Sequence, residues 1–239
     1  MGVGEINKRL IKIILPILAV LLVFGLTFNT LRDMYVKSRL EAGVELNKAL
    51  ANMENITEYK YSLKSGFTVE GREEVISRVE GEKSQGRTHI KGEMVNTPVD
   101  IYYIDRTIYN YDSVSGKWLI IESDTTNSEE LLISELNPLS NFQIRAPGKV
   151  DKIGFEKIDG TECLEVRCQT GVQSELLETF WKDFEYRFWI DYHKGLVKKA
   201  RVEAKNKESF ETLLRIEVVF DEINRHISVE APDTSAGKE

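Results

Sequence analysis

The sequence predicts an α+β fold: a large antiparallel β-sheet, covered on one face by a few helices and preceded by one N-terminal transmembrane helix. Three observations predict it. From residue 58 onward most of the chain alternates apolar and polar side chains, which is the two-residue period of a half-buried strand. Only a few segments have the apolar spacing of an amphipathic helix. Near the N-terminus, 19 consecutive residues carry no charge.

The uncharged run extends from Ile13 to Leu31 and is long enough to span a bilayer. Three basic residues precede it, and such a flank stays in the cytoplasm. A cleaved leader would need a shorter apolar run and a small-x-small site, which residues 28–33 do not offer. We therefore expect residues 1–33 to be a cytoplasmic stub and an uncleaved signal anchor in a bacterial plasma membrane, with the C-terminal domain extracytoplasmic. A leader cut at a degenerate site is the alternative.

After the anchor, residues 34–55 have apolar side chains at three- and four-residue steps and predict a helix. At Glu58 the period changes to two, and strands joined by Gly, Asn, Asp and Ser turns follow. Two further amphipathic helices are expected at 128–142 and 174–184. We read the outer part as one domain, residues 34–232, with a frayed tail at 233–239. Its strands are predicted as one continuous meander at 58–70, 73–82, 88–95, 99–105, 107–111, 117–121, 149–157, 161–168, 185–193, 196–205 and 210–220.

The charge and the cysteines exclude several classes of protein. Without residues 1–33, which hold four of the 32 basic and two of the 39 acidic residues, the chain has a net charge of −9. Nucleic-acid binders carry clustered positive charge, so no nucleic-acid partner is expected. Cys163 and Cys168 are an odd number of residues apart on one predicted strand and face opposite ways. They cannot form a disulfide with each other.

No recognisable catalytic motif is present, and the three histidines lack the spacing of metal ligands. Asp183, Glu185 and Asp191 could form a carboxylate group, but acidic residues alternating with apolar ones are typical of a solvated sheet face. Cys168 beside Arg167 could be an activated thiol, although a small buried apolar residue is the simpler interpretation. We therefore expect no enzyme activity, no catalytic residue, no cofactor and no metal.

The large apolar face of the strands is the most informative feature of the outer domain. It either closes into a dry core under the helices, or belongs to a strongly curved sheet too wide for them, which leaves an apolar cavity. In the second case the candidate ligand-binding residues that line the cavity are Tyr59, Tyr61, Leu63, Phe67, Val69, Val99, Ile101, Tyr103, Phe188, Ile190, Leu214, Ile216, Val218 and Phe220.

The order of elements resembles the LolA/LppX/LprG group of extracytoplasmic lipoprotein and lipid carriers, whose fold recurs in the N-terminal domain of RseB-type regulators. The similar stretches are YKYSLKSGF, VDIYYIDRTIYNYDSVSGKW, ELLISELNPLSNF, GFEKIDGTECLEVRC, FWIDYHKGLVKK and VVFDEIN. Asp159-Gly160, Trp189-Ile190-Asp191 and Gly195-Leu196 carry it most strongly, and it covers residues 34–232 in pattern more than in identity. It implies a strongly curved sheet, an open half-barrel, with helices over its concave face. One departure is that the carriers are soluble or lipid-anchored, whereas this chain keeps a helical anchor.

Two hypotheses of function follow. The first is a membrane-anchored binding protein that holds an acyl chain or a lipidated or amphipathic ligand in an apolar hollow, in envelope lipoprotein or lipid handling. The second is a non-enzymatic structural or sensory envelope protein that acts through a protein partner. An enzyme, which would need a polar cluster assembled only by folding, is the third alternative.

Overall fold

The computed structural model describes residues 31–122, 136–171, 175–209 and 211–234. The chain divides into two units, residues 1–41 and 42–239. In the first unit, residues 31–39 are helical. The predicted membrane span lies outside the described residues except for Leu31. Within the described ranges, no helix is both long and apolar enough to cross a membrane.

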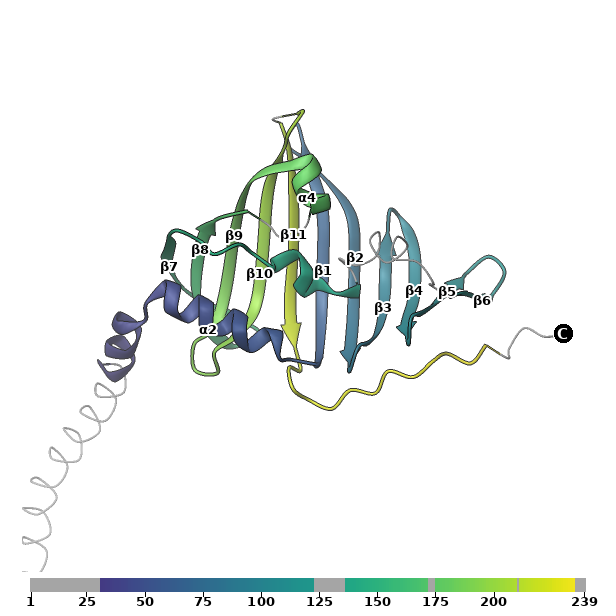
Figure 1. The fold of residues 1–239 in the computed structure, drawn as a ribbon, viewed down its shortest axis with the longest axis horizontal. Coiled ribbons are helices and arrows are strands. Elements are labelled where there is room, and N and C mark those ends of the chain that lie inside the picture. Colours follow the sequence, from purple (N-terminus) through teal and green to yellow (C-terminus); the bar gives the residue numbers. More distant parts are fainter. Residues whose placement is uncertain (1–30, 123–135, 172–174, 210, 235–239) are drawn as a thin grey trace, which may run out of the picture. The chain divides into compact units, whose positions relative to one another are not determined.

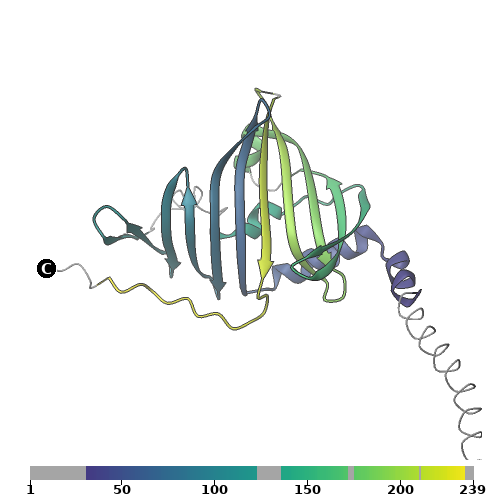
Figure 2. The ribbon, with the colours of Figure 1, turned by 180° about the vertical axis from the view of Figure 1, so that it is seen from behind.

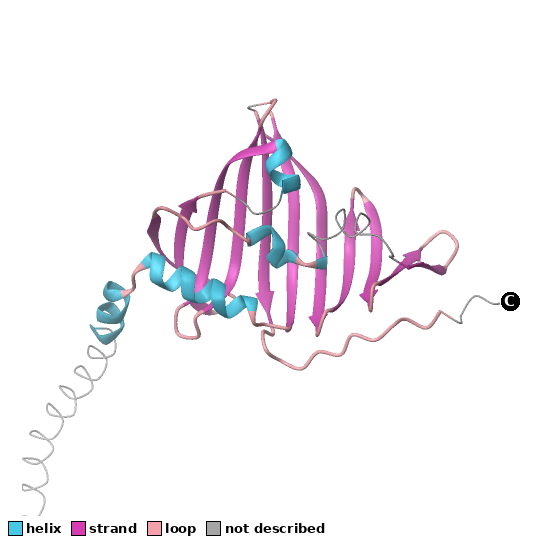
Figure 3. Ribbon diagram, viewed as in Figure 1, coloured by secondary structure: helices cyan, strands magenta, loops and turns pink. Residues whose placement is uncertain are grey.

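The second unit is built on one curved sheet of 11 strands (Figures 1 and 3). All neighbouring strands are antiparallel, in the order β6-β5-β4-β3-β2-β1-β11-β10-β9-β8-β7. The strands are β1 (Glu58–Val69), β2 (Arg72–Ser84), β3 (Arg87–Met94), β4 (Thr97–Ile104), β5 (Thr107–Asp112), β6 (Lys117–Glu122), β7 (Val150–Ile158), β8 (Thr161–Gln169), β9 (Trp181–Asp191), β10 (Leu196–Asn206) and β11 (Thr212–Asp221).

The sheet consists of two meanders. The chain runs from β1 outward to the edge strand β6, returns to the opposite edge at β7, and runs inward to β11, which pairs with β1 in the middle of the sheet. The predicted single continuous meander was therefore wrong: the meander is broken between β6 and β7, which lie at opposite edges of the sheet. Pairing of β1 with β11 joins residues about 150 positions apart, as in Leu63 opposite Val218, and no local pattern encodes such a pairing.

The helices that the structure describes within the second unit lie on one face of the sheet. Helix α2 (Ala42–Glu54), the 3₁₀ helix η1 (Pro138–Phe142) and α4 (Glu175–Phe180) stand in front of the strands in Figure 1 and behind them in Figure 2. This is the concave face, which the sequence analysis expected the helices to cover. The apolar positions of the central strands point toward it: Tyr61 lies opposite Phe220, and Leu63 opposite Val218, all at most 3% exposed.

Helix α2 buries one stripe, Leu46, Ala49 and Met53, and packs against β7, β9 and β10. Asn52 Nδ2 donates a hydrogen bond of 2.8 Å to the carbonyl of Gly195 in the β9–β10 turn. The predicted single helix over 34–55 is interrupted, because residues 40 and 41 are not helical.

The other two predicted helices differ more from the structure. Residues 128–135 lie outside the described residues, and the end of that segment is the 3₁₀ helix that Pro138 begins. Helix α4 ends at Phe180, and the prediction that Trp181 and Phe184 are helical was wrong. Phe184, Tyr186 and Phe188 alternate along β9, and Trp181 stacks on Phe67 of β1 with 5.4 Å between ring centroids.

Candidate functional site

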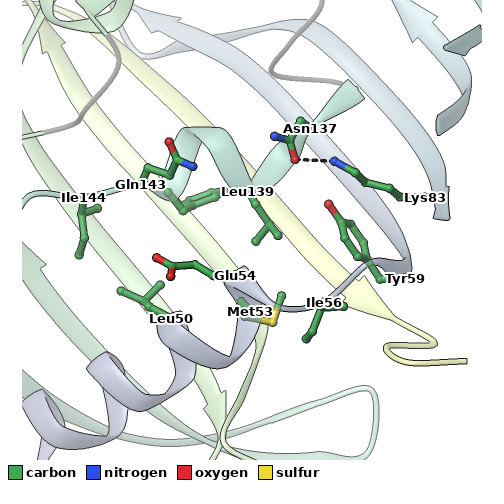
Figure 4. A pocket seen from close by; sticks show the side chains of 11 residues that line it. Leu50, Met53, Glu54, Ile56, Tyr59, Lys83, Asn137, Leu139, Gln143 and Ile144 are labelled. Atoms are coloured by element: carbon green, nitrogen blue, oxygen red, sulfur yellow. Dashed lines mark hydrogen bonds between the residues drawn. The ribbon is translucent and has the colours of Figure 1, made fainter. Parts of the chain in front are cut away.

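A pocket of about 390 Å³ lies between the C-terminal half of α2, the first strands of the sheet and the segment that carries η1 (Figure 4). We call residues 136–144, which form this segment, the strap. The volume falls in the range of about 300 to 1,000 Å³ typical of small-ligand pockets. The lining residues are Leu50, Met53, Glu54, Ile56, Tyr59, Lys83, Asn137, Leu139, Phe142, Gln143 and Ile144.

Two walls of the pocket carry apolar side chains, and polar groups expose about as much surface to it as apolar groups do. Helix α2 brings Leu50 and Met53 to one side because they lie three residues apart on the same helical face. The strap brings Leu139 and Phe142 to the other side. Phe142 is 3% exposed and sits edge-on to Tyr186 and Phe188 of β9, with ring centroids 6.4 and 6.1 Å away. These contacts hold the strap over the sheet and keep its apolar side chains turned inward.

The strap is also held by hydrogen bonds to the strands beneath it. Lys83 Nζ on β2 donates to Asn137 Oδ1 at 2.9 Å, and the buried Thr88 on β3 donates to the carbonyl of Leu136 at 3.3 Å. Just beyond its other end, the amide of Arg145 donates to the carbonyl of Gly171 at 3.0 Å. The strap thus crosses the sheet from β3 toward the segment that follows β8.

Lys83, Asn137 and Tyr59 bring polar groups together at one end of the pocket. Tyr59 is fully buried, and its hydroxyl has no hydrogen-bond partner within the described part of the chain. Burial raises the pKa of Tyr59 above its ordinary value. Burial also lowers the pKa of Lys83, because the charged ammonium is partly withdrawn from water. Glu54 is exposed and lies on the far side of the pocket from Lys83 (Figure 4).

Of the 14 predicted lining residues, the pocket contains Tyr59. The others lie along the same face of the sheet outside it. Nine of them are buried, Phe67, Val99 and Tyr103 are partly buried, and Val69 is 39% exposed. Their role in ligand binding stays a prediction. The nine buried residues are Tyr61, Leu63, Ile101, Phe188, Ile190, Leu214, Ile216, Val218 and Phe220.

The sequence analysis missed the other ten lining residues, which come from α2, from the link to β1, from the strap and from β2. A signal existed for Lys83. It lies two residues after Gly81 and four after Val79, so strand alternation directs it to the apolar face, where an unpaired cation needs an explanation. No comparable signal existed for the strap, whose position depends on the crossing between the two meanders.

The catalytic candidates are dispersed. Asp191 is buried and accepts the amides of His193 and Lys194, both at 3.1 Å, so it caps a turn. Asp183 pairs with Lys205, and Glu185 with Arg187. Among the described residues no group of three His, Cys, Asp or Glu side chains is placed to hold a metal ion.

The two cysteines are buried, unpaired and on opposite faces of β8, as predicted. Burial raises the pKa of each thiol to about 11, the opposite of activation.

A second hollow, of about 550 Å³, lies on the convex face over β1, β2 and β3. Its side chains are largely charged and paired with neighbours: Lys64 with Glu73 at 2.6 Å, and Lys91 with Asp100 at 3.4 Å. Such a surface is typical of a solvated sheet face, and we take the pocket under the strap as the candidate site.

The fold is that of the LolA/LppX/LprG-like proteins. The lipoprotein LppX of Mycobacterium tuberculosis superposes with a TM-score of 0.57 at 14% identity, over 79% of this chain and 98% of LppX. LprF of Mycobacterium bovis gives 0.53 at 11% identity, over 80% of this chain and 96% of LprF. A LolA superfamily protein of Nitrosomonas europaea gives 0.35 at 8% identity, over 81% and 96% of the two chains. The sequence matches no family model and no curated protein. The predicted fold resemblance is confirmed.

Proposed function

We propose that this chain is a membrane-anchored, extracytoplasmic binding protein that holds an acyl chain, or a lipidated or amphipathic ligand, in the pocket under the strap. The observation that carries the proposal is the pocket itself, in which apolar side chains from α2 and the strap lie beside polar groups that include Lys83 and Tyr59. Burial of hydrocarbon would drive binding, at roughly 0.8 kcal/mol for each CH₂ removed from water. The proposal assigns no catalytic step, cofactor or metal.

The fold supports the general class of this proposal, an extracytoplasmic lipid-binding protein, and not the particular ligand. LppX, whose structure this chain resembles, is described as a lipoprotein, and a role in envelope lipid or lipoprotein handling fits a protein of that architecture. The anchor rests on the uncharged run 13–31 and its basic flank. A C-terminal reporter protein that is active only outside the cytoplasm tests the orientation: we expect it to be active, and an inactive reporter that is present at normal levels would reject the orientation.

Organic extraction of the purified full chain, followed by mass spectrometry, tests ligand binding. We expect a lipid to co-purify and to be lost from the variant Leu139→Trp, in which a large ring fills the pocket. The control is Leu119→Trp, at a half-exposed position on β6. Lipid that is equally abundant in both variants is bound to the anchor or the surface, and that result would count against the proposal.

The second candidate is a structural or sensory envelope protein that acts through a protein partner. It is favoured by the edge strand β6, where Leu119, Ile120 and Ile121 are each about half exposed. An exposed apolar edge strand can pair with a strand of another protein. Cross-linking in intact cells from a photoreactive residue at 119 would give one dominant partner if this candidate is right, and a diffuse background if it is not.

A further inference from the structure

The polar end of the pocket under the strap contains two hydrogen-bond donors that the described residues do not fully use. The Lys83 ammonium has three donors, and one of them binds Asn137 Oδ1. No carboxylate in the described ranges lies within ion-pair distance of Lys83. The Tyr59 hydroxyl is buried and has no hydrogen-bond partner among the described residues. In Figure 4 it points toward the hydrogen bond between Lys83 and Asn137.

Both groups need an acceptor, and the acceptor that suits them is negatively charged. A cation that is partly withdrawn from water, as Lys83 is, is unfavourable without a counter-charge, and so is a buried hydroxyl without a partner. A neutral carbonyl oxygen would satisfy the hydroxyl but leave the ammonium charge uncompensated. A carboxylate or a phosphate oxygen would satisfy both, because hydrogen bonds between an ammonium and an oxyanion are the stronger kind.

We propose that Lys83 and Tyr59 together bind the anionic oxygen of the ligand's head group, so that the pocket selects anionic amphiphiles over neutral ones. This inference rests on the proposed function. In the empty protein Asn137 Oδ1 occupies the acceptor position, and the ligand oxygen replaces it. The carboxylate of Glu54, across the pocket, repels an anion and so orients the head group toward Lys83, with the hydrocarbon along Leu50 and Leu139.

Three photoactivatable probes with the same ten-carbon chain test the selection: a carboxylic acid, an alkyl phosphate and an alcohol, each with a diazirine at the tail. The full chain is reconstituted in lipid nanodiscs and irradiated, and the labelled peptides are identified by mass spectrometry. Labelling is counted only on residues 50–56 and 136–144, which distinguishes the pocket from the anchor. The acid and phosphate arms distinguish the two sources of the oxyanion.

We expect Lys83→Met to reduce labelling by the acid or the phosphate by about tenfold or more, and labelling by the alcohol by less than about twofold. Tyr59→Phe is the milder second variant. It should weaken labelling by the anionic probe and leave the alcohol unchanged. The unliganded protein should be as stable as the wild type or more stable, since the removed hydroxyl forms no hydrogen bond within the described part of the chain. Lys48→Met, at an exposed position on α2, is the control and should change nothing.

The inference is overturned if Lys83→Met leaves the anionic probes unaffected, or if it weakens acid, phosphate and alcohol equally. If the alcohol labels the wild-type pocket as strongly as the anionic probes, acyl binding stands and the anion selection is wrong. If no probe labels the pocket, the proposed function itself is wrong. The two failures therefore give different results.

Discussion

At the residue scale, Gly81 shows how closely the concave face is packed. A Cβ atom at this position would lie 2.1 Å from Cζ of Tyr61, on the strand paired with it. Tyr61 is itself buried beside Tyr59, with 5.9 Å between ring centroids, so its ring has little room to move. The absence of a side chain at residue 81 therefore allows the Tyr61 ring to lie across β2.

We expect Gly81→Ala to lower the free energy of unfolding by about 2 kcal/mol, because the added methyl overpacks a filled region. Urea unfolding measures the loss. Gly154→Ala on β7 is the matched control, since a Cβ there meets nothing within 4 Å. Its effect should be close to zero or slightly stabilising. Equal losses in the two variants would show that the Tyr61 contact is not the cause.

The buried thiols give a second residue-scale prediction. With a pKa raised to about 11 by burial, only about one in a thousand thiols of Cys163 or Cys168 is ionised at pH 8. Because the thiolate is the reactive form, both cysteines should react with a disulfide reagent at least about a hundredfold more slowly in the native protein than in urea. The rate should rise as the pH approaches 11. Val114→Cys, at a position 95% exposed, is the control and should add one fast-reacting thiol.

At the element scale, an ion pair on the convex face joins β10 to β11. Arg201 lies directly opposite Glu217, and its Nε donates to Glu217 Oε2 at 2.7 Å. Lys199 Nζ is 3.0 Å from the same carboxylate. Burial alone would raise the pKa of Glu217, but the hydrogen bonds from Lys199 and Arg201 outweigh it, and the net pKa is lowered from 4.5.

We expect Glu217→Gln to lower the free energy of unfolding by about 1 kcal/mol at neutral pH, a modest value because the pair is partly exposed. A carboxylate with a lowered folded pKa stabilises the protein above its unfolded pKa of 4.5. The contribution is lost as the pH falls through the lower folded value. The wild type and the variant should therefore converge in urea unfolding at a pH below 4.5. Glu203→Gln, which breaks the more exposed pair with Arg215, is the control and should cost less. A difference that persists at low pH would contradict this account.

The elements also show what the sequence could and could not predict. The hairpin at Asp159-Gly160 was predictable because both residues adopt positive φ, 46° and 79°, which that dipeptide tolerates. Each strand carried its own two-residue period, so the strands were found within a few residues. Trp181 and Phe184 were misassigned because three-residue spacing fits a helix as well as the start of an irregular strand. For the site, Tyr59 was found because apolar and polar residues alternate along β1. Leu139 and Phe142 belong to the strap, and no local sequence pattern shows that the strap crosses the face of the sheet.

At the scale of the whole molecule, the C-terminal tail links the two meanders on the face opposite the helices. After β11 the chain turns where the amide of Asn224 donates to the carbonyl of Glu58 at 2.9 Å. It then runs extended past the ends of the strands of the first meander, at the bottom of Figure 1. Ile227 and Val229 are each 5% exposed and pack against Ile104 of β4, with Tyr102 and Tyr109 beside them. The tail thus connects β11, the last strand of the second meander, to β4 and β5 of the first meander.

Removal of residues 226–239 should therefore destabilise the sheet unevenly. Full burial of each of the two apolar side chains contributes about 1.5 to 3 kcal/mol, and ordering the tail offsets part of it, so we expect a net loss of about 2 kcal/mol. Hydrogen exchange should show the loss of protection concentrated in β4 and β5, with β9 and β10 nearly unchanged, because Ile227 and Val229 pack against residues of β4 and β5. Removal of residues 231–239 keeps Ile227 and Val229 and should cause a much smaller loss in both measurements than the longer truncation. Uniform deprotection of all strands by the longer truncation would show instead that the tail stabilises the junction of β1 with β11 and not the outer strands.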